Sequence, residues 1–115
     1  MIDVYGIRNC DTIRKTLNWL TEQDIPHHFH DYRKDGLSER LIDSFMSRFS
    51  TDELINRRGT TWRKLPESVR DNLTPATARS LMLANPSLIR RPILSDGNSW
   101  LIGFDPDAIS RTLNP

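Results

Sequence analysis

The first 32 residues carry a strand pattern, a helix pattern and a second strand pattern, in that order. "MIDVYG" (1–6) alternates apolar and polar residues and ends at a glycine, which is typical of a strand. From Asp11 to about Glu22, apolar residues recur at i, i+4 and i+7, the spacing of one helix face. These apolar residues are Ile13, Leu17 and Leu20. "HHFHDY" (27–32) then reads as the second strand, and such a unit favours two parallel strands joined by a right-handed crossover.

The end of the chain shows two strand patterns followed by a helix. "LIRRPIL" (88–94) predicts a strand interrupted by proline, "SDGNS" (95–99) a hairpin turn, and "WLIGF" (100–104) the return strand. Asp105 and Pro106 cap a final helix. Its inward-facing residues are Ala108, Ile109 and Leu113. We therefore predict an α/β chain of thioredoxin-like fold, with a four-stranded mixed sheet built from a β-α-β half and a β-β-α half.

The residues between these halves carry helix signals only. Ser38 can cap a helix, Ser50 and Glu53 have capping-box spacing at the start of another, and Thr74 with Pro75 opens a third. The apolar residues of the first of these helices are Leu41, Ile42, Phe45 and Met46. We expect a single domain over 1–115, with thioredoxin-like halves at about 1–36 and 88–115 and a helical insertion at about 37–87.

Proline at the entry to a central strand is unusual because it removes a hydrogen-bond donor from the sheet. Pro92 stands at such a position. A proline there calls for an unusual turn, often one with a cis peptide bond. We predict that the Arg91–Pro92 bond is cis.

Composition and charge exclude several classes of protein. The formal net charge is +1, so no global field attracts nucleic acid or an anionic membrane. The sequence shows no secretory signal and no apolar run that approaches a membrane span. A single cysteine excludes an internal disulfide and favours a reducing location. We expect a cytoplasmic monomer without a nucleic-acid or membrane partner.

The single cysteine, Cys10, lies where the first helix pattern begins. Unpaired N–H groups and the helix dipole favour an anion there, and only a thiolate is an effective nucleophile. Arg8 adds positive charge two residues upstream, and the same geometry can hold an incoming oxyanion. Position alone leaves a second interpretation open, because free cysteines are commonly small buried apolar residues.

The kind of thiol chemistry follows from what surrounds this cysteine in the sequence. Position +3 from Cys10 is Ile13, so the C-x-x-C pair of a dithiol oxidoreductase is missing. Any adduct on the thiol must then be released by an outside thiol, for which glutathione is the obvious cytosolic candidate. The sequence therefore predicts a monothiol enzyme, if Cys10 is catalytic.

Arginines gather in two segments far from the cysteine. "NRRGTTWRK" supplies Arg57, Arg58 and Arg63, and "LIRRPIL" supplies Arg90 and Arg91. In a thioredoxin-like sheet, the turn that contains a cis-proline faces the first strand–helix loop, so Arg91 is expected near Cys10. Alternation along the strand places Arg90 on the opposite side. For each arginine the alternative is a solvated basic surface.

A metal site has little support in the sequence. His28 and His30 fall on one face of the second predicted strand, but no convincing third ligand lies nearby. Strand surface is the simpler explanation of these histidines. We predict neither a metal nor a tightly bound cofactor.

Four segments resemble one known family. "YGIRNCDT", "FHDYRKDGL", "NRRGTTWRKL" and "RRPIL" are similar to the arsenate reductase (ArsC)-like family, most closely its YffB subgroup and more distantly the Spx regulators. The segments appear in family order and span almost the whole chain. The resemblance implies a thioredoxin-like fold with a helical insertion and a nucleophilic cysteine. In the arsenate reductases that thiolate attacks arsenate, arginines hold the oxyanion, and glutathione with glutaredoxin completes the reduction.

The resemblance also implies roles for individual residues. Cys10 matches the nucleophile, Arg91 the arginine before the proline, and Thr12 the threonine of the cysteine loop. Arg58 best matches the arginine of the insertion, although the neighbouring Arg57 leaves its register open by one residue.

Three positions depart from the pattern of the arsenate reductases. Gly6 stands in place of a histidine, Ile13 in place of a serine, and Gly103 near the place of a further arginine. Losing one of three arginines costs on the order of a few kcal/mol of oxyanion stabilisation. We therefore expect that efficient arsenate reduction is not the native task.

The resulting prediction is a glutathione-dependent monothiol reductase. Its predicted catalytic residues are Cys10, Arg91 and Arg58. Its predicted substrate-binding residues are Arg8, Asn9, Asp11 and Thr12. Expected partners are glutathione as co-substrate, glutaredoxin, and a small-molecule or thiol substrate. The alternatives are an Spx-like regulatory module that contacts RNA polymerase, and an arsenate reductase that uses glutathione and glutaredoxin.

Overall fold

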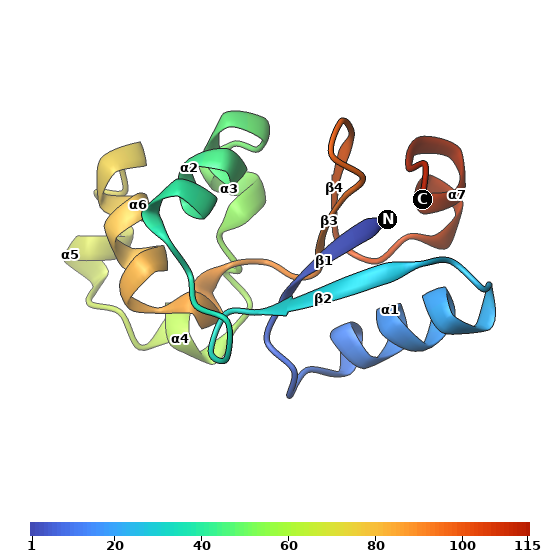
Figure 1. The fold of residues 1–115 in the computed structure, drawn as a ribbon. Helices are drawn as coiled ribbons and strands as arrows, with labels where there is room; N and C mark the ends of the chain where they lie inside the picture. Colours follow the sequence, from blue (N-terminus) through green and yellow to red (C-terminus); the bar gives the residue numbers. More distant parts are fainter. The chain divides into compact units, whose positions relative to one another are not determined.

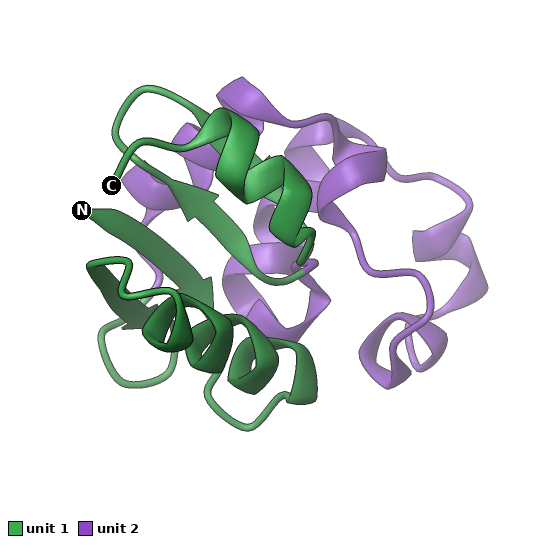
Figure 2. Ribbon diagram, turned by 90° about the vertical axis from the view of Figure 1, so that its right-hand side faces the viewer, with its two compact units in different colours: residues 1–36, 91–115 green, residues 37–90 purple.

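The computed structural model describes residues 1–115, which divide into two compact units (Figure 2). The sheet unit consists of Met1–Gly36 and Arg91–Pro115, and the helical unit consists of Leu37–Arg90. The organisation of both as one domain stays a prediction. No helix in either unit is both long and apolar enough to cross a membrane.

The sheet unit contains four strands and two helices (Figure 1). The strands are β1 (Ile2–Gly6), β2 (His27–Asp31), β3 (Ile93–Ser95) and β4 (Trp100–Ile102). The helices are α1 (Asp11–Glu22) and α7 (Pro106–Thr112). The strand order is β2-β1-β3-β4, with β1 parallel to β2 and antiparallel to β3, and β3 antiparallel to β4. This arrangement confirms the predicted mixed sheet of thioredoxin-like topology.

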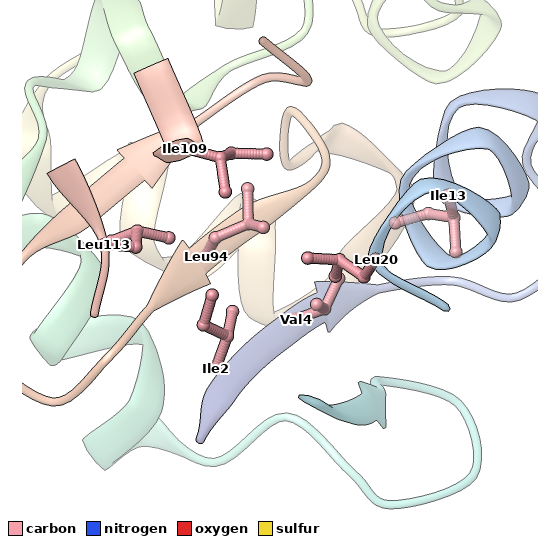
Figure 3. Packing of buried hydrophobic residues seen from close by; sticks show 7 residues of the cluster. All are labelled: Ile2, Val4, Ile13, Leu20, Leu94, Ile109 and Leu113. Atoms are coloured by element: carbon pink, nitrogen blue, oxygen red, sulfur yellow. The ribbon is translucent and has the colours of Figure 1, made fainter. Parts of the chain in front are cut away.

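One face of this sheet and both helices share an apolar core (Figure 3). Val4 pairs with Leu94 across β1 and β3, so their side chains lie on the same face and meet the helices. The buried members of the core are Ile2, Val4, Ile13, Leu20, Leu94, Ile109 and Leu113. Ile13 lies in the first turn of α1, so its burial in this core fixes the N-terminal end of the helix, next to Cys10.

The helical unit contains the three predicted helices and shorter elements that the sequence did not reveal. The predicted helices are α2 (Glu39–Arg48), α3 (Thr51–Leu54) and α6 (Pro75–Ala84). Ser38, Ser50 and Thr74 cap them through their side chains, as predicted. The additional elements are α4 (Thr60–Arg63), α5 (Glu67–Arg70) and the 3-10 helix η1 (Pro86–Leu88). Each has only three or four residues, too few to show a helical period.

The predicted strand at 88–94 is wrong over residues 88–92. Leu88 ends η1, and Ile89 forms an isolated antiparallel bridge with Ile55 inside the helical unit. The third strand begins only at Ile93, after the Arg91–Pro92 bond, which is cis as predicted. The consecutive residues Arg90 and Arg91 therefore belong to different units.

Candidate functional site

Cys10 occupies the N-cap position of α1, with extended backbone angles of φ −146° and ψ 129°. Its N–H donates to the Arg8 carbonyl oxygen at 2.8 Å, and its own carbonyl accepts the first helical hydrogen bond, from Arg14 N–H, at 3.0 Å. The side chain is half-buried and carries a free thiol. The cysteine thus stands where helical N–H groups lack intrahelical partners.

Arg91 contacts the sulfur directly. Its Nε donates a hydrogen bond to Cys10 Sγ at 3.2 Å, across 81 residues of sequence. The topology explains this contact, because β3 pairs with β1 and brings the residues before β3 beside the loop that follows β1. Accordingly, a side-chain carbon built on Gly6 at the end of β1 would lie 3.6 Å from Arg91 Cβ.

These surroundings change the pKa of the thiol in opposite directions. Burial of Cys10 raises its pKa, but the N–H groups of Ile13 and Thr12 and the guanidinium of Arg91 lower it. The thiol makes no side-chain capping hydrogen bond of standard geometry, so we regard these N–H groups as weak donors toward the sulfur. The lowering contributions prevail, and the pKa of Cys10 lies below its ordinary value.

Two of the predicted substrate-binding residues flank the cysteine on its N-terminal side. Arg8 is exposed, and its guanidinium carbon lies 5.1 Å from the centre of the Phe29 ring. It does not appear among the groups that shift the pKa of Cys10. Asn9 is exposed, in the bend that precedes the cysteine. The structure therefore places Arg8 on an aromatic ring, whereas Arg91 supplies the positive charge at the thiol.

The other two substrate-binding candidates open α1. Asp11 is exposed and forms an ion pair with Arg14. Thr12 is half-buried, and its carbonyl accepts a 2.7 Å hydrogen bond from the Thr16 hydroxyl. Only the backbone N–H of Thr12 acts on Cys10, so the threonine contributes through its position in the helix.

Gly6 and Ile13 occupy a shared space next to the cysteine loop. A Cβ atom on Gly6 would meet Cδ1 of the Ile13 side chain far inside van der Waals contact. Ile13 is fully buried, so its side chain has little room to move away. The two departures from the arsenate reductase pattern are thus coupled, because a histidine at position 6 would require a smaller residue at position 13.

Gly103 follows β4 with a φ of +86°, in the left-handed region that favours glycine. Its N–H donates to the Pro92 carbonyl at 2.8 Å, which fixes the turn. Nothing would crowd a side chain there, so strain in the backbone is the obstacle to arginine at this position.

A second group of arginines lines a pocket within the helical unit. Its volume is about 310 Å³, and we call it the basic pocket. The residues that line it are Ile55, Asn56, Arg57, Arg58 and Arg90. Sequence analysis singled out Arg58 alone in this set as catalytic. The ring of Trp62 is buried and lies 5.3 Å from the Arg57 guanidinium carbon, which holds this arginine in place. The tryptophan close to the arginines in the sequence was the available sign of this contact.

The histidines of β2 do not take part in a metal cluster. His30 Nε2 forms a 2.7 Å hydrogen bond with the Gly36 carbonyl oxygen. No group of three or more His, Cys, Asp and Glu side chains in residues 1–115 is arranged to hold a metal ion.

Comparisons with known proteins agree on one family. The model of the ArsC family matches residues 5–112. The solved YFFB protein is 39% identical, with a TM-score of 0.91 and coverage of 99% of this chain and 100% of that one. An arsenate reductase (ArsC) related protein from Brucella melitensis is 44% identical, with a TM-score of 0.81 and coverage of 96% and 92%. The global transcriptional regulator Spx of Listeria innocua is 34% identical over 115 residues, 98% of this chain and 87% of that protein.

Proposed function

The chain belongs to the ArsC family, and from this membership and the geometry of Cys10 we propose a glutathione-dependent monothiol reductase. Membership by itself suggests either a thiol-based reductase or an Spx-like regulator. The observation that favours the reductase is the 3.2 Å contact of Arg91 Nε with Cys10 Sγ at the start of α1. A lowered thiol pKa supports it, because the thiolate is the nucleophilic form.

The proposed reaction has two thiol–disulfide exchanges. The Cys10 thiolate attacks the glutathione sulfur of a mixed disulfide, forms a Cys10–glutathione disulfide and expels the substrate thiolate, which takes a proton. The thiolate of a second glutathione then attacks the glutathione sulfur of that adduct. Oxidised glutathione leaves, and Cys10 returns as the thiolate. In sum, one mixed disulfide and one glutathione give one substrate thiol and one oxidised glutathione.

The residues around the sulfur have distinct parts in this proposal. Arg91 stabilises the thiolate before attack and again when Cys10 becomes the leaving group in the second exchange. The N–H groups of Thr12 and Ile13 favour the same charge. Arg58 stays a proposed second anion clamp, on the basis of the family resemblance alone.

Arsenate is the less favoured substrate. Gly6, Ile13 and Gly103 replace the histidine, serine and arginine expected from the resemblance. A side chain at position 6 meets Ile13, and the positive φ of Gly103 disfavours arginine, so neither Gly6→His nor Gly103→Arg alone fits the surrounding structure. We propose that the site is built for disulfide exchange.

The proposal is tested by steady-state reduction of a glutathione–hydroxyethyl mixed disulfide, with glutathione as reductant and arsenate as a parallel substrate. Wild type is compared with Cys10→Ser, and with Arg111→Gln, which changes an exposed arginine of α7, as a matched control. Turnover of the disulfide that requires Cys10 and survives Arg111→Gln supports the proposal. Equal rates for wild type and Cys10→Ser would overturn it. Turnover of arsenate but not of the mixed disulfide would show that arsenate is the substrate.

A regulatory role is the second candidate, and the similarity to Spx over 98% of the chain is the observation that favours it. We propose RNA polymerase as the partner in that case. Purified bacterial RNA polymerase mixed with the protein would then give a stoichiometric complex in size-exclusion chromatography, unchanged in Cys10→Ser. Failure to form a complex in either form would remove this candidate.

A further inference from the structure

We propose that the basic pocket binds a small-molecule ligand through an oxyanion, either a carboxylate or a phosphate. The three arginines that line it, Arg57, Arg58 and Arg90, all belong to the helical unit. The proposal does not depend on the chemistry of Cys10. Arg58 is also the second anion clamp of the proposed function, so for this residue the inference rests on that function, and it goes further by adding Arg57, Arg90 and the class of ligand.

The charge in the pocket is only partly balanced by the protein. Arg57 pairs with Asp52 at 2.8 Å and lies over the Trp62 ring. Arg58 and Arg90 are both exposed, and neither forms an ion pair with a carboxylate. Like charges around one concavity repel each other, and a bound anion removes that cost. The pocket thus holds three cations against one carboxylate.

The backbone beneath the arginines is fixed before any ligand arrives. Ile55 and Ile89 form an antiparallel bridge and are almost fully buried. Two hydrogen bonds flank the bridge, from Asn56 N–H to the Leu88 carbonyl at 2.8 Å and from Arg90 N–H to the Leu54 carbonyl at 2.7 Å. The segments that carry Arg57, Arg58 and Arg90 are therefore tied together at their base.

The loop that carries Arg58 is held by its neighbour as well. The Asn56 Oδ1 accepts a hydrogen bond from Arg58 N–H at 3.2 Å, which closes an Asx turn. A carbon added to Gly59 would lie 3.0 Å from Asn56 Nδ2, so glycine at this position leaves the amide in place. The backbone that carries Arg58 is therefore fixed by Asn56.

The lining defines the chemical class of the ligand. Guanidinium groups bind carboxylates and phosphates through paired N–H donors. Ile55 is the sole apolar residue of the lining, so apolar ligands gain little from entering. The volume of about 310 Å³ suits a small molecule. Together these features favour a compact polar ligand with at least one oxyanion.

The test follows the pocket by NMR on the uniformly ¹⁵N-labelled full chain, using backbone amide and arginine Nε–H signals. The two probes are inorganic phosphate and S-methylglutathione, which carries two carboxylates and has no thiol to react with Cys10. Sodium chloride keeps the ionic strength constant throughout each titration. We expect saturable shifts at Asn56, Arg58 and Arg90 with at least one probe, and the effective probe identifies the oxyanion.

Variants make the result specific. Arg58→Gln combined with Arg90→Gln is expected to weaken binding at least tenfold, whereas Arg63→Gln, an exposed arginine of α4 outside the lining, leaves it unchanged. Cys10→Ser is expected to bind as wild type does, so failure of the reductase proposal and failure of this one are distinguishable. Shifts that do not saturate with either probe, or equal affinity in wild type and the double variant, would overturn the proposal.

Discussion

Arginine takes two different roles in the two units of this protein. In the sheet unit, Arg91 lies 3.2 Å from a thiol that can itself become an anion. In the helical unit, Arg58 and Arg90 line a pocket without a nucleophile and without carboxylates of their own. A guanidinium beside an ionisable sulfur stabilises a charge that the protein generates. A guanidinium that lacks such a partner instead favours an anion from outside.

The contrast is sharpest between two consecutive residues. Arg90 is held in the helical unit by its N–H bond to the Leu54 carbonyl, and its side chain lines the basic pocket. Arg91 begins the second segment of the sheet unit and donates to the sulfur. One step along the backbone thus separates an arginine proposed to bind ligand from an arginine proposed to assist catalysis.

The largest expected effect comes from Cys10→Ser. A hydroxyl at this position is not ionised at neutral pH, so mixed-disulfide turnover should fall to the rate without protein. Binding of the two NMR probes in the basic pocket should not change. Steady-state kinetics checks the loss of turnover, and the NMR titration of the same preparation checks the unchanged binding. Loss of probe binding in Cys10→Ser would contradict the separation of the catalytic arginine from the ligand-binding arginines.

Replacing the arginine at the thiol should have the next largest effect. Arg91→Gln removes a hydrogen bond from a charged donor, and the expected loss in kcat/KM is about ten- to a hundredfold. Arg91→Lys keeps the charge without the planar fork and should fall between wild type and Arg91→Gln. A kcat/KM for Arg91→Gln within error of wild type would show that Arg91 is no more than a surface cation.

The packing next to the site gives a smaller effect, on stability. Gly6→Ala introduces a carbon where Ile13 already lies, and overpacking of this kind costs about 1–3 kcal/mol. In an Ile13→Ala background the same substitution should cost less, because the clash is gone. Urea unfolding of the four proteins of this cycle measures the coupling, and additive effects would mean that the two residues do not compete for space.

The smallest expected effect, on the free energy of unfolding, concerns the Asp96 carboxylate, which backbone N–H groups hold without an arginine. Asp96 accepts hydrogen bonds from the backbone of Asn98, Ser99 and Asn114, and they lower the pKa of its carboxyl to about 2, from 3.8. Because the carboxyl pKa is lower in the folded state than in the unfolded chain, the carboxylate stabilises the folded state above about pH 4. This contribution is lost as the pH falls toward about 2.

Asp96→Asn isolates that contribution. The free energy of unfolding should be lower in the variant at neutral pH, and the difference from wild type should shrink as the pH falls from about 4 to about 2. Urea unfolding at a series of pH values measures it. A difference that is independent of pH would indicate that the N–H groups do not favour the carboxylate.

Much of the sheet unit could be predicted from the sequence, because its elements have strong local signals. Apolar alternation located β1, the helical period located α1, and Pro92 located the cis bond. The predicted thioredoxin-like topology then placed Arg91 beside Cys10, a contact across 81 residues that no local pattern contains.

The parts that could not be predicted depend on tertiary packing. The residues at 88–90 have a strand-like composition, yet the bridge to Ile55 and the bond to Leu54 hold them in the helical unit. The short helices α4 and α5 lack a period, so the convergence of Arg57, Arg58 and Arg90 in one pocket was not visible. The exclusion of a side chain at Gly6 by Ile13 likewise appears only in three dimensions.

The most direct test of the account is the pH dependence of Cys10 alkylation by iodoacetamide. Because only the thiolate reacts, the midpoint of the rate profile gives the pKa of the thiol. We expect a midpoint below the ordinary thiol value of about 8.5 in wild type, moving upward in Arg91→Gln. A wild-type midpoint at or above the ordinary value, or the same midpoint in both proteins, would contradict the claim that the surroundings hold Cys10 as a thiolate.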